Sequence, residues 1–205
     1  MASQPVNVLD GIYVFAFRPD DNFSGVKIMN PGGRTITGEQ LEELKTNPQA
    51  IKELARHPNG WHLSSHRSFV GPYAARFAGQ GGTITGWLFS CAFYFEAGRD
   101  YEAAIYYCGD DTSTLKGAGA GVIPPHPMNQ QRLQLRLGKS QTPEAMTQDI
   151  FEVGVSGPEP QVAKGVFSVP ETGSYHFSLQ GHTTGLGAIS VLMNSGSPRG
   201  ALADF

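Results

Sequence analysis

The sequence predicts an all-β protein, either a β-sandwich or a jelly-roll-like barrel, with one short helical insertion. The 205 residues include 26 glycines and 14 prolines but only 16% charged residues, which is typical of a turn-rich, helix-poor chain. Short runs rich in Val, Ile, Phe and Tyr recur along the sequence, and turn-forming residues bound each run. Only residues 37–57 carry the signals of helix formation.

The first elements are expected to be a hairpin followed by the helical insertion. Residues 12–17 and 26–29 are β-rich, and clusters of Pro, Asp, Asn and Gly separate and follow them. Thr37 and Gln40 form a capping box, which predicts a helix beginning there, and a second short helix restarts at Asn47 and Pro48.

The rest of the chain is predicted to be short strands within one domain spanning residues 1–205. These strands come from the runs WHLSSHRSFV, PYAARFAG, RLQLRLG, IFEVGVSG, VAKGVFSV, SYHFSLQG and LGAISVLM and from residues 86–111. The proline-rich residues 122–131 are interpreted as an extended connection. They are not taken as a domain boundary, because the 74 residues that follow would make a marginal β domain.

Residues 86–111 contain both cysteines in the most apolar and aromatic stretch of the chain. We expect a hairpin here, and a loop centred on Arg99 and Asp100 would place Cys91 directly opposite Cys108. A three-residue loop would instead send the two sulfurs to opposite faces. Reduced thiols in the core are the favoured interpretation of the pair, and a cross-strand disulfide is the alternative.

No metal or cofactor site is expected from the sequence. Two cysteines cannot complete a tetrahedral zinc site, and in a strand His62 and His66 would lie about 13 Å apart, too far to share one ion. The glycines at 117, 119 and 121 do not form the dinucleotide-binding pattern GxGxxG.

Candidate binding residues are Trp61, His62, Asp110 and Asp111. Trp61, like Trp87, is a large amphipathic side chain suited to stacking on a ligand, although either tryptophan can belong to the core, and the core is favoured especially for Trp87. Asp110 and Asp111 follow a predicted strand, where loops cluster, and could bind Ca²⁺ or sugar hydroxyls or simply begin a turn.

Charge argues against two classes of partner. Lys and Arg number 15 against 18 Asp and Glu, so the net charge of −3 gives no electrostatic footprint for nucleic acid or an anionic membrane. The first residues lack a signal peptide and no apolar run is long enough to span a membrane, from which we expect a cytoplasmic or non-classically released protein.

Residues 165–196 carry one family resemblance. The pattern Phe167-x-x-Pro170-x-x-Gly173-x-Tyr175-x-Phe177 resembles the strand-turn-strand of complement-type and tumour-necrosis-factor-like jelly rolls, and of other β-sandwich binding modules. The resemblance implies a jelly roll that forms homo-oligomers and binds partners without catalysis.

Two functional classes therefore remain open. The favoured one is a non-enzymatic module that recognises a carbohydrate, a lipid or a protein, because no complete catalytic constellation is visible. The alternative is a small β-barrel enzyme, a cyclase or hydrolase acting on an apolar small molecule, with acid and base groups drawn from His62, His66, Asp110 and Asp111.

Overall fold

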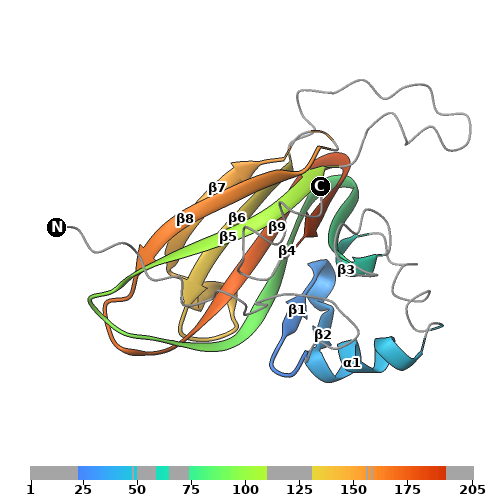
Figure 1. Ribbon diagram of the computed structural model, residues 1–205. Coiled ribbons are helices and arrows are strands. Elements are labelled where there is room, and N and C mark those ends of the chain that lie inside the picture. The colour runs from blue at the N-terminus through green and yellow to red at the C-terminus, as the bar shows by residue number, and fades with distance from the viewer. Residues whose placement is uncertain are drawn as a thin grey trace, which may run out of the picture.

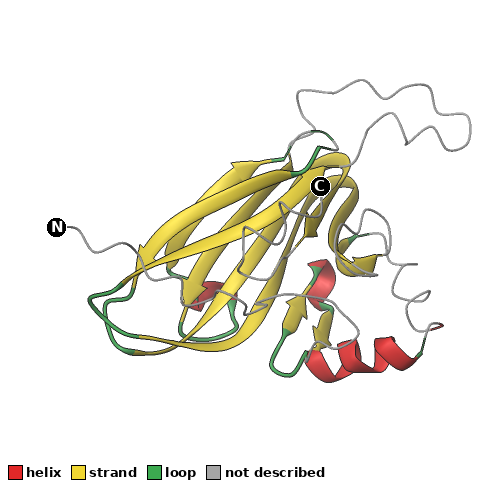
Figure 2. Ribbon diagram, viewed as in Figure 1, coloured by secondary structure: helices red, strands yellow, loops and turns green. Residues whose placement is uncertain are grey.

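The fold is a β-sandwich with one short α-helix, which confirms the predicted class (Figure 2). The computed structural model describes residues 23–47, 49, 59–64, 74–109, 131–155, 157 and 159–192. Within these residues the helix is α1 (Gly38–Thr46), and all strand pairs are antiparallel. The strands are β1 (Lys27–Met29), β2 (Thr35–Thr37), β3 (Gly60–Ser64), β4 (Ala74–Phe95), β5 (Asp100–Gly109), β6 (Gln131–Gly138), β7 (Gln148–Gly154), β8 (Gln161–Ser168) and β9 (Gly173–Leu192).

Strands β4 and β9 connect the two layers of the sandwich. They pair along almost their whole length, and both turn over at one end of the molecule, where the pairing shifts register between Gln80 and Thr83 (Figure 1). Gly82, with φ of +73°, supplies a left-handed conformation at this bend. Residues 83–95 and 173–184 therefore join β1, β2, β6 and β7 in the β6–β7 layer. Residues 74–80 and 186–192 join β3, β5 and β8 in the β5–β8 layer.

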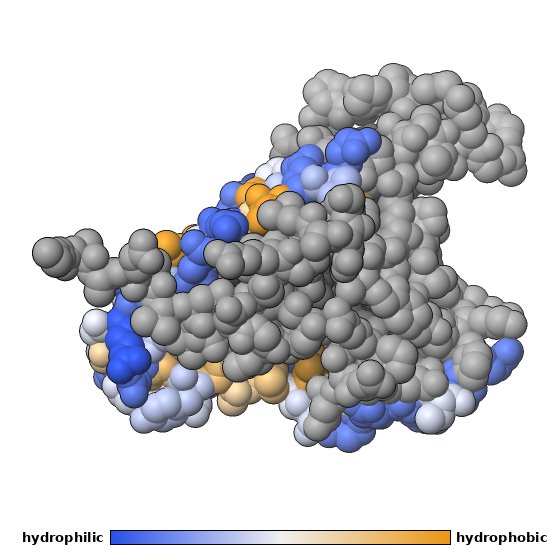
Figure 3. Space-filling model, viewed as in Figure 1, coloured by the Kyte–Doolittle hydropathy of each residue, from blue (hydrophilic) through white to orange (hydrophobic). Residues whose placement is uncertain are grey.

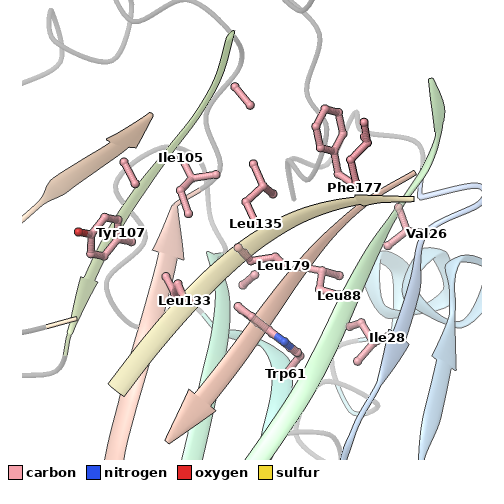
Figure 4. Packing of buried hydrophobic residues seen from close by; sticks show 14 of the residues in the cluster. Val26, Ile28, Trp61, Leu88, Ile105, Tyr107, Leu133, Leu135, Phe177 and Leu179 are labelled. Atoms are coloured by element: carbon pink, nitrogen blue, oxygen red, sulfur yellow. The ribbon is translucent and has the colours of Figure 1, made fainter. Parts of the chain in front are cut away.

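The core fills the space between these two layers (Figure 4). Two register shifts in β4, at Gln80/Thr83 and at Phe89/Ala92, change which alternate positions point inward. Phe77 points inward before the first shift, Leu88 between the two, and Phe95 after the second, and all three side chains are buried. Strand β4 can thus serve both layers and still keep its large side chains in one core.

Trp61 belongs to this core, which agrees with the favoured interpretation of Trp61 and contradicts its alternative role as a ligand-stacking residue. Its side chain is only 1% exposed, and its ring packs against Phe77 with 5.2 Å between ring centroids. Its indole N–H donates to the carbonyl of Gly86 at 3.1 Å. The side chain of Asn30 accepts from the Trp61 amide at 2.7 Å and donates to the Trp61 carbonyl at 2.9 Å. Every polar group of Trp61 is therefore paired inside the protein.

The hairpin predicted to pair Cys91 with Cys108 is wrong. Strand β5 pairs with β8 and with the end of β9, and no pairing of β5 with β4 occurs among the described residues. The turn after Phe95 carries the chain from the β6–β7 layer to the β5–β8 layer, so the cysteines stand in different layers. Both are free thiols, which excludes the disulfide; Cys108 is buried as expected for core filling, and Cys91 is partly exposed.

The helix begins where the capping box predicts. The Thr37 hydroxyl accepts from the Gln40 amide at 3.5 Å, and the Gln40 side chain accepts from the Thr37 amide at 2.9 Å. Helix α1 ends at Thr46, and of the remaining predicted helical segment only Asn47 and Gln49 are described. Residues 122–130 of the proline-rich connection also lie outside the described residues, and residue 131 begins β6.

The contact of Phe77 with Gly181 gives a stability prediction. A Cβ atom added at Gly181 would overlap the ring of Phe77, which is fully buried and cannot move aside freely. We expect Gly181→Ala to lower the free energy of unfolding by about 1–3 kcal/mol, measured by denaturant titration. The control is Gly154→Ala in β7, where an added Cβ meets nothing within 4 Å and the change should stay within about 0.5 kcal/mol. Equal stability of the two variants would contradict this description of the core.

Candidate functional site

The outer face of the β6–β7 layer carries a partly exposed tryptophan among polar side chains. The strand registers place Met29, Trp87, Gln180, Gln134 and Glu152 in one row across five strands. Their chain neighbours, including Ile28, Leu88, Leu179 and Leu133, are buried, so this row points outward. We call this surface the Trp87 face: Thr85, Trp87, Arg132, Gln134, Arg136, Gln180 and His182.

The Trp87 ring is held from two sides. It stacks on Phe89, with 6.1 Å between ring centroids and 5° between ring planes, and Phe89 itself is fully buried. The guanidinium carbon of Arg136 lies 5.9 Å from the Trp87 ring centroid, within the range of a cation–π interaction. Trp87 remains partly exposed, so it presents a preorganised aromatic surface to solvent.

His182 lies beside Trp87 in the neighbouring row. Its Nδ1 atom is 3.0 Å from the hydroxyl of Thr85, its partner across the strands. Partial burial lowers the pKa of His182 below its ordinary value, and the positive charge of Arg132 lowers it further, while Glu152 opposes these effects. The imidazole is therefore neutral at pH 7, and a neutral ring offers one hydrogen-bond donor and one acceptor.

Charged pairs border the face on the side of β7. Arg132 donates to Glu152 at 3.2 Å, and Arg136 donates to Asp149. Arg136 stands opposite Ser178, which is fully buried and whose hydroxyl has no hydrogen-bond partner. Both arginines are thus oriented by carboxylates on the outermost strand of this layer.

The loop between β6 and β7 closes one end of the face. The Gln141 side chain donates to the carbonyls of Ser90, at 2.8 Å, and of Gly25. Lys27 donates to the carbonyl of Gln141 at 3.2 Å, and its ammonium lies 6.0 Å from the Phe89 ring centroid. These contacts fix the loop against β1 and β4.

Of the site residues predicted from the sequence, the structure describes only Trp61 and His62. Trp61 is in the core, and His62 lies on β3 in the other layer, with its Nδ1 atom 3.2 Å from the Gly60 carbonyl. His66, Asp110 and Asp111 lie outside the described residues. Within the described part of the chain, no group of three His, Cys, Asp or Glu side chains could hold a metal ion.

Sequence reasoning missed the Trp87 face because it favoured the core for Trp87. A signal was nevertheless present in residues 131–138, where Arg132, Gln134 and Arg136 alternate strictly with Leu133, Leu135 and Leu137. Such alternation is typical of a strand with one face in the core and one in solvent. It identifies the polar half of the face, but it does not reveal which tryptophan lies beside it.

Comparison with known proteins yields structural likeness only. No family model matches the chain, and no curated protein sequence matches it. A family 61 carbohydrate-binding module in complex with β-1,4-galactotriose is 11% identical, with a TM-score of 0.47, over 84% of this chain and 87% of that one. The K1 cleaved adhesin domain of Lys-gingipain from Porphyromonas gingivalis is 10% identical, with a TM-score of 0.47, over 67% and 82% of the two chains.

The enzymatically active domain of tailspike protein 4 from bacteriophage CBA120 has a TM-score of 0.50 and 8% identity. The match covers 90% of this chain but only 20% of the tailspike chain. At this level of identity the likeness concerns the fold alone. Among the described residues, no helix has the length and apolar character needed to cross a membrane.

The lowered pKa of His182 predicts how stability depends on pH. Below about pH 6.5 the unfolded chain binds a proton at this histidine more readily than the folded protein does, so acidification favours unfolding. The stabilisation should be fully present above about pH 6.5 and should decline as the pH falls toward the folded-state pKa. In His182→Gln, thermal unfolding between about pH 7 and pH 5 should lose part of this pH dependence; an unchanged dependence would contradict the assignment.

Proposed function

We propose that this protein is a non-catalytic glycan-binding module and that its ligand binds the Trp87 face. The main observation behind this proposal is that Trp87 is partly exposed and is held by Phe89 and Arg136. It lies in one row with the side-chain amides of Gln180 and Gln134. A sugar has an apolar C–H face that stacks on an indole and hydroxyl groups that need both donors and acceptors. Glutamine amides and a neutral imidazole supply both kinds of partner.

The same surface favours a glycan over the other two partner classes considered. A lipid would require an apolar concave surface, whereas the row continues from Trp87 through the polar side chains of Gln180, Gln134 and Glu152. The centre of a protein interface is more apolar than this row, in which the amides of Gln180 and Gln134 continue beyond Trp87. Oligomerisation of the chain remains a separate prediction.

The position of the face also supports a rigid binding site. Its side chains come from the middle of paired strands and not from loops, and the inward neighbours of each are buried in the core. A binding surface built on paired strands loses little conformational entropy when the ligand binds.

Removal of the Trp87 ring provides the test. We expect Trp87→Ala to weaken binding to a responsive polysaccharide by about 30-fold or more, since truncating a central aromatic residue typically costs about 2 kcal/mol. The measurement is affinity electrophoresis in polysaccharide-containing gels, followed by calorimetry. Trp87→Phe should retain part of the affinity.

Val166→Ala is the matched control. Val166 is 59% exposed and Val162 is 44% exposed on β8, where apolar surface is visible along the strand in Figure 3. This surface belongs to the β5–β8 layer, so its truncation should leave glycan binding unchanged. Full affinity in Trp87→Ala, or a loss confined to Val166→Ala, would refute the proposed function.

A further inference from the structure

The charges on the Trp87 face are arranged asymmetrically. The described strands of the β6–β7 layer carry Lys27, Arg132 and Arg136 against two carboxylates, Glu152 and Asp149, an excess of one positive charge. The strand order here is β1, β4, β9, β6, β7, so the arginines of β6 lie between the carboxylates of β7 and Trp87. A ligand seated on Trp87 therefore meets guanidinium groups before it meets carboxylates.

The partners of these arginines leave donors available. A guanidinium has five N–H groups in a planar fork, and Arg132 directs one terminal nitrogen to Glu152 at 3.2 Å. The side chains of Arg132 and Glu152 are each 46% exposed, and an exposed ion pair of this kind contributes at most about 1 kcal/mol. A carboxylate on a ligand can therefore take hydrogen bonds from Arg132 at little cost.

A cation and a carboxylate both lie near His182. Burial lowers the pKa of this histidine most, the positive charge of Arg132 lowers it further, and Glu152 has a smaller opposing effect. Arg132 and Thr85 stand on either side of His182 in the same row, so the positive charge of Arg132 adjoins the polar part of the face.

We propose that the glycan bound at the Trp87 face is acidic and that Arg132 binds a sugar carboxylate, which makes Arg132 a specificity-determining residue. This inference rests on the proposed function and names the ligand class of the same site. One sugar unit stacks on Trp87 and hydrogen-bonds Gln180 and Gln134. Its carboxylate, or that of the adjoining unit, accepts hydrogen bonds from Arg132. Glu152 orients Arg132 and competes with the ligand for it.

The test compares three polymers: a polyuronate (polygalacturonate), a neutral galactan and dextran sulfate. The wild type should bind polygalacturonate most tightly, and Arg132→Gln should weaken that binding roughly tenfold, a larger factor than for its binding to galactan. Glu152→Gln should tighten binding to polygalacturonate, because it removes the competing carboxylate. Arg99→Gln is the control, since Arg99 is also exposed and paired with a glutamate, Glu96, at 2.7 Å, but lies in the turn after β4.

The outcomes separate this inference from the proposed function. The proposal of an acidic ligand is overturned if the protein binds galactan as tightly as polygalacturonate, or if Arg132→Gln binds like Arg99→Gln. Either result leaves the proposed glycan-binding function intact. Dextran sulfate bound as tightly as polygalacturonate overturns the assignment of a carboxylate. Polysaccharide binding that survives intact in Trp87→Ala refutes the site itself, and with it both proposals.

Discussion

The aromatic ring of Phe77 lies against the backbones of Gly181 and Gly86, and the arrangement of the two layers depends on this contact. Phe77 comes from the arm of β4 in the β5–β8 layer, whereas both glycines lie in the β6–β7 layer. A Cβ at Gly86 would come within 2.8 Å of the ring, and one at Gly181 would overlap it. Only glycine at these positions lets the folded-over ribbon of β4 and β9 close with the ring in direct contact.

The same contact determines the geometry of the outer face. Gly86 directly precedes Trp87, and Gly181 lies between Gln180 and His182. The Phe77 ring therefore packs on the inner side of these strands, directly behind the candidate ligand-binding residues on the outer side. Trp61 reinforces the arrangement, because its indole donates to the Gly86 carbonyl and Asn30 pairs both backbone groups of Trp61. The core thereby fixes the backbone on which the face is built, and the two surfaces are coupled through the strands themselves.

Local patterns in the sequence predicted the fold class and the helix, because these depend on neighbouring residues. The capping box at Thr37 and Gln40 needs only a helical turn, and the alternation of Leu133, Leu135 and Leu137 needs only one strand. The pairing of β4 with β9 links residues about a hundred positions apart, and the sequence contains no local trace of it. The hairpin expected around Cys91 and Cys108 failed for this reason, since two adjacent apolar strands can pair with each other or with distant strands.

The candidate site was harder still, because the local surroundings of each tryptophan in the sequence suggest the opposite of its position in the structure. Trp61 lies in a polar stretch, yet Asn30 and Gly86 satisfy its polar groups in the core. Trp87 lies in an apolar stretch, yet the register shift between Gln80 and Thr83 turns Leu88 inward and leaves Trp87 outward. One inserted residue decides which of the neighbouring side chains reaches the surface.

The two indole N–H groups therefore provide the most direct measurement of the central claim, that the folded-over ribbon presents Trp87 and buries Trp61. In a ¹H–¹⁵N NMR titration with oligogalacturonate, we expect the indole signal of Trp87 and the side-chain amide signals of Gln134 and Gln180 to shift together. The indole signal of Trp61, which is hydrogen-bonded to the Gly86 carbonyl, should not shift. A shift of the Trp61 indole without that of Trp87, or shifts confined to β8 residues such as Val162 and Val166, would contradict it.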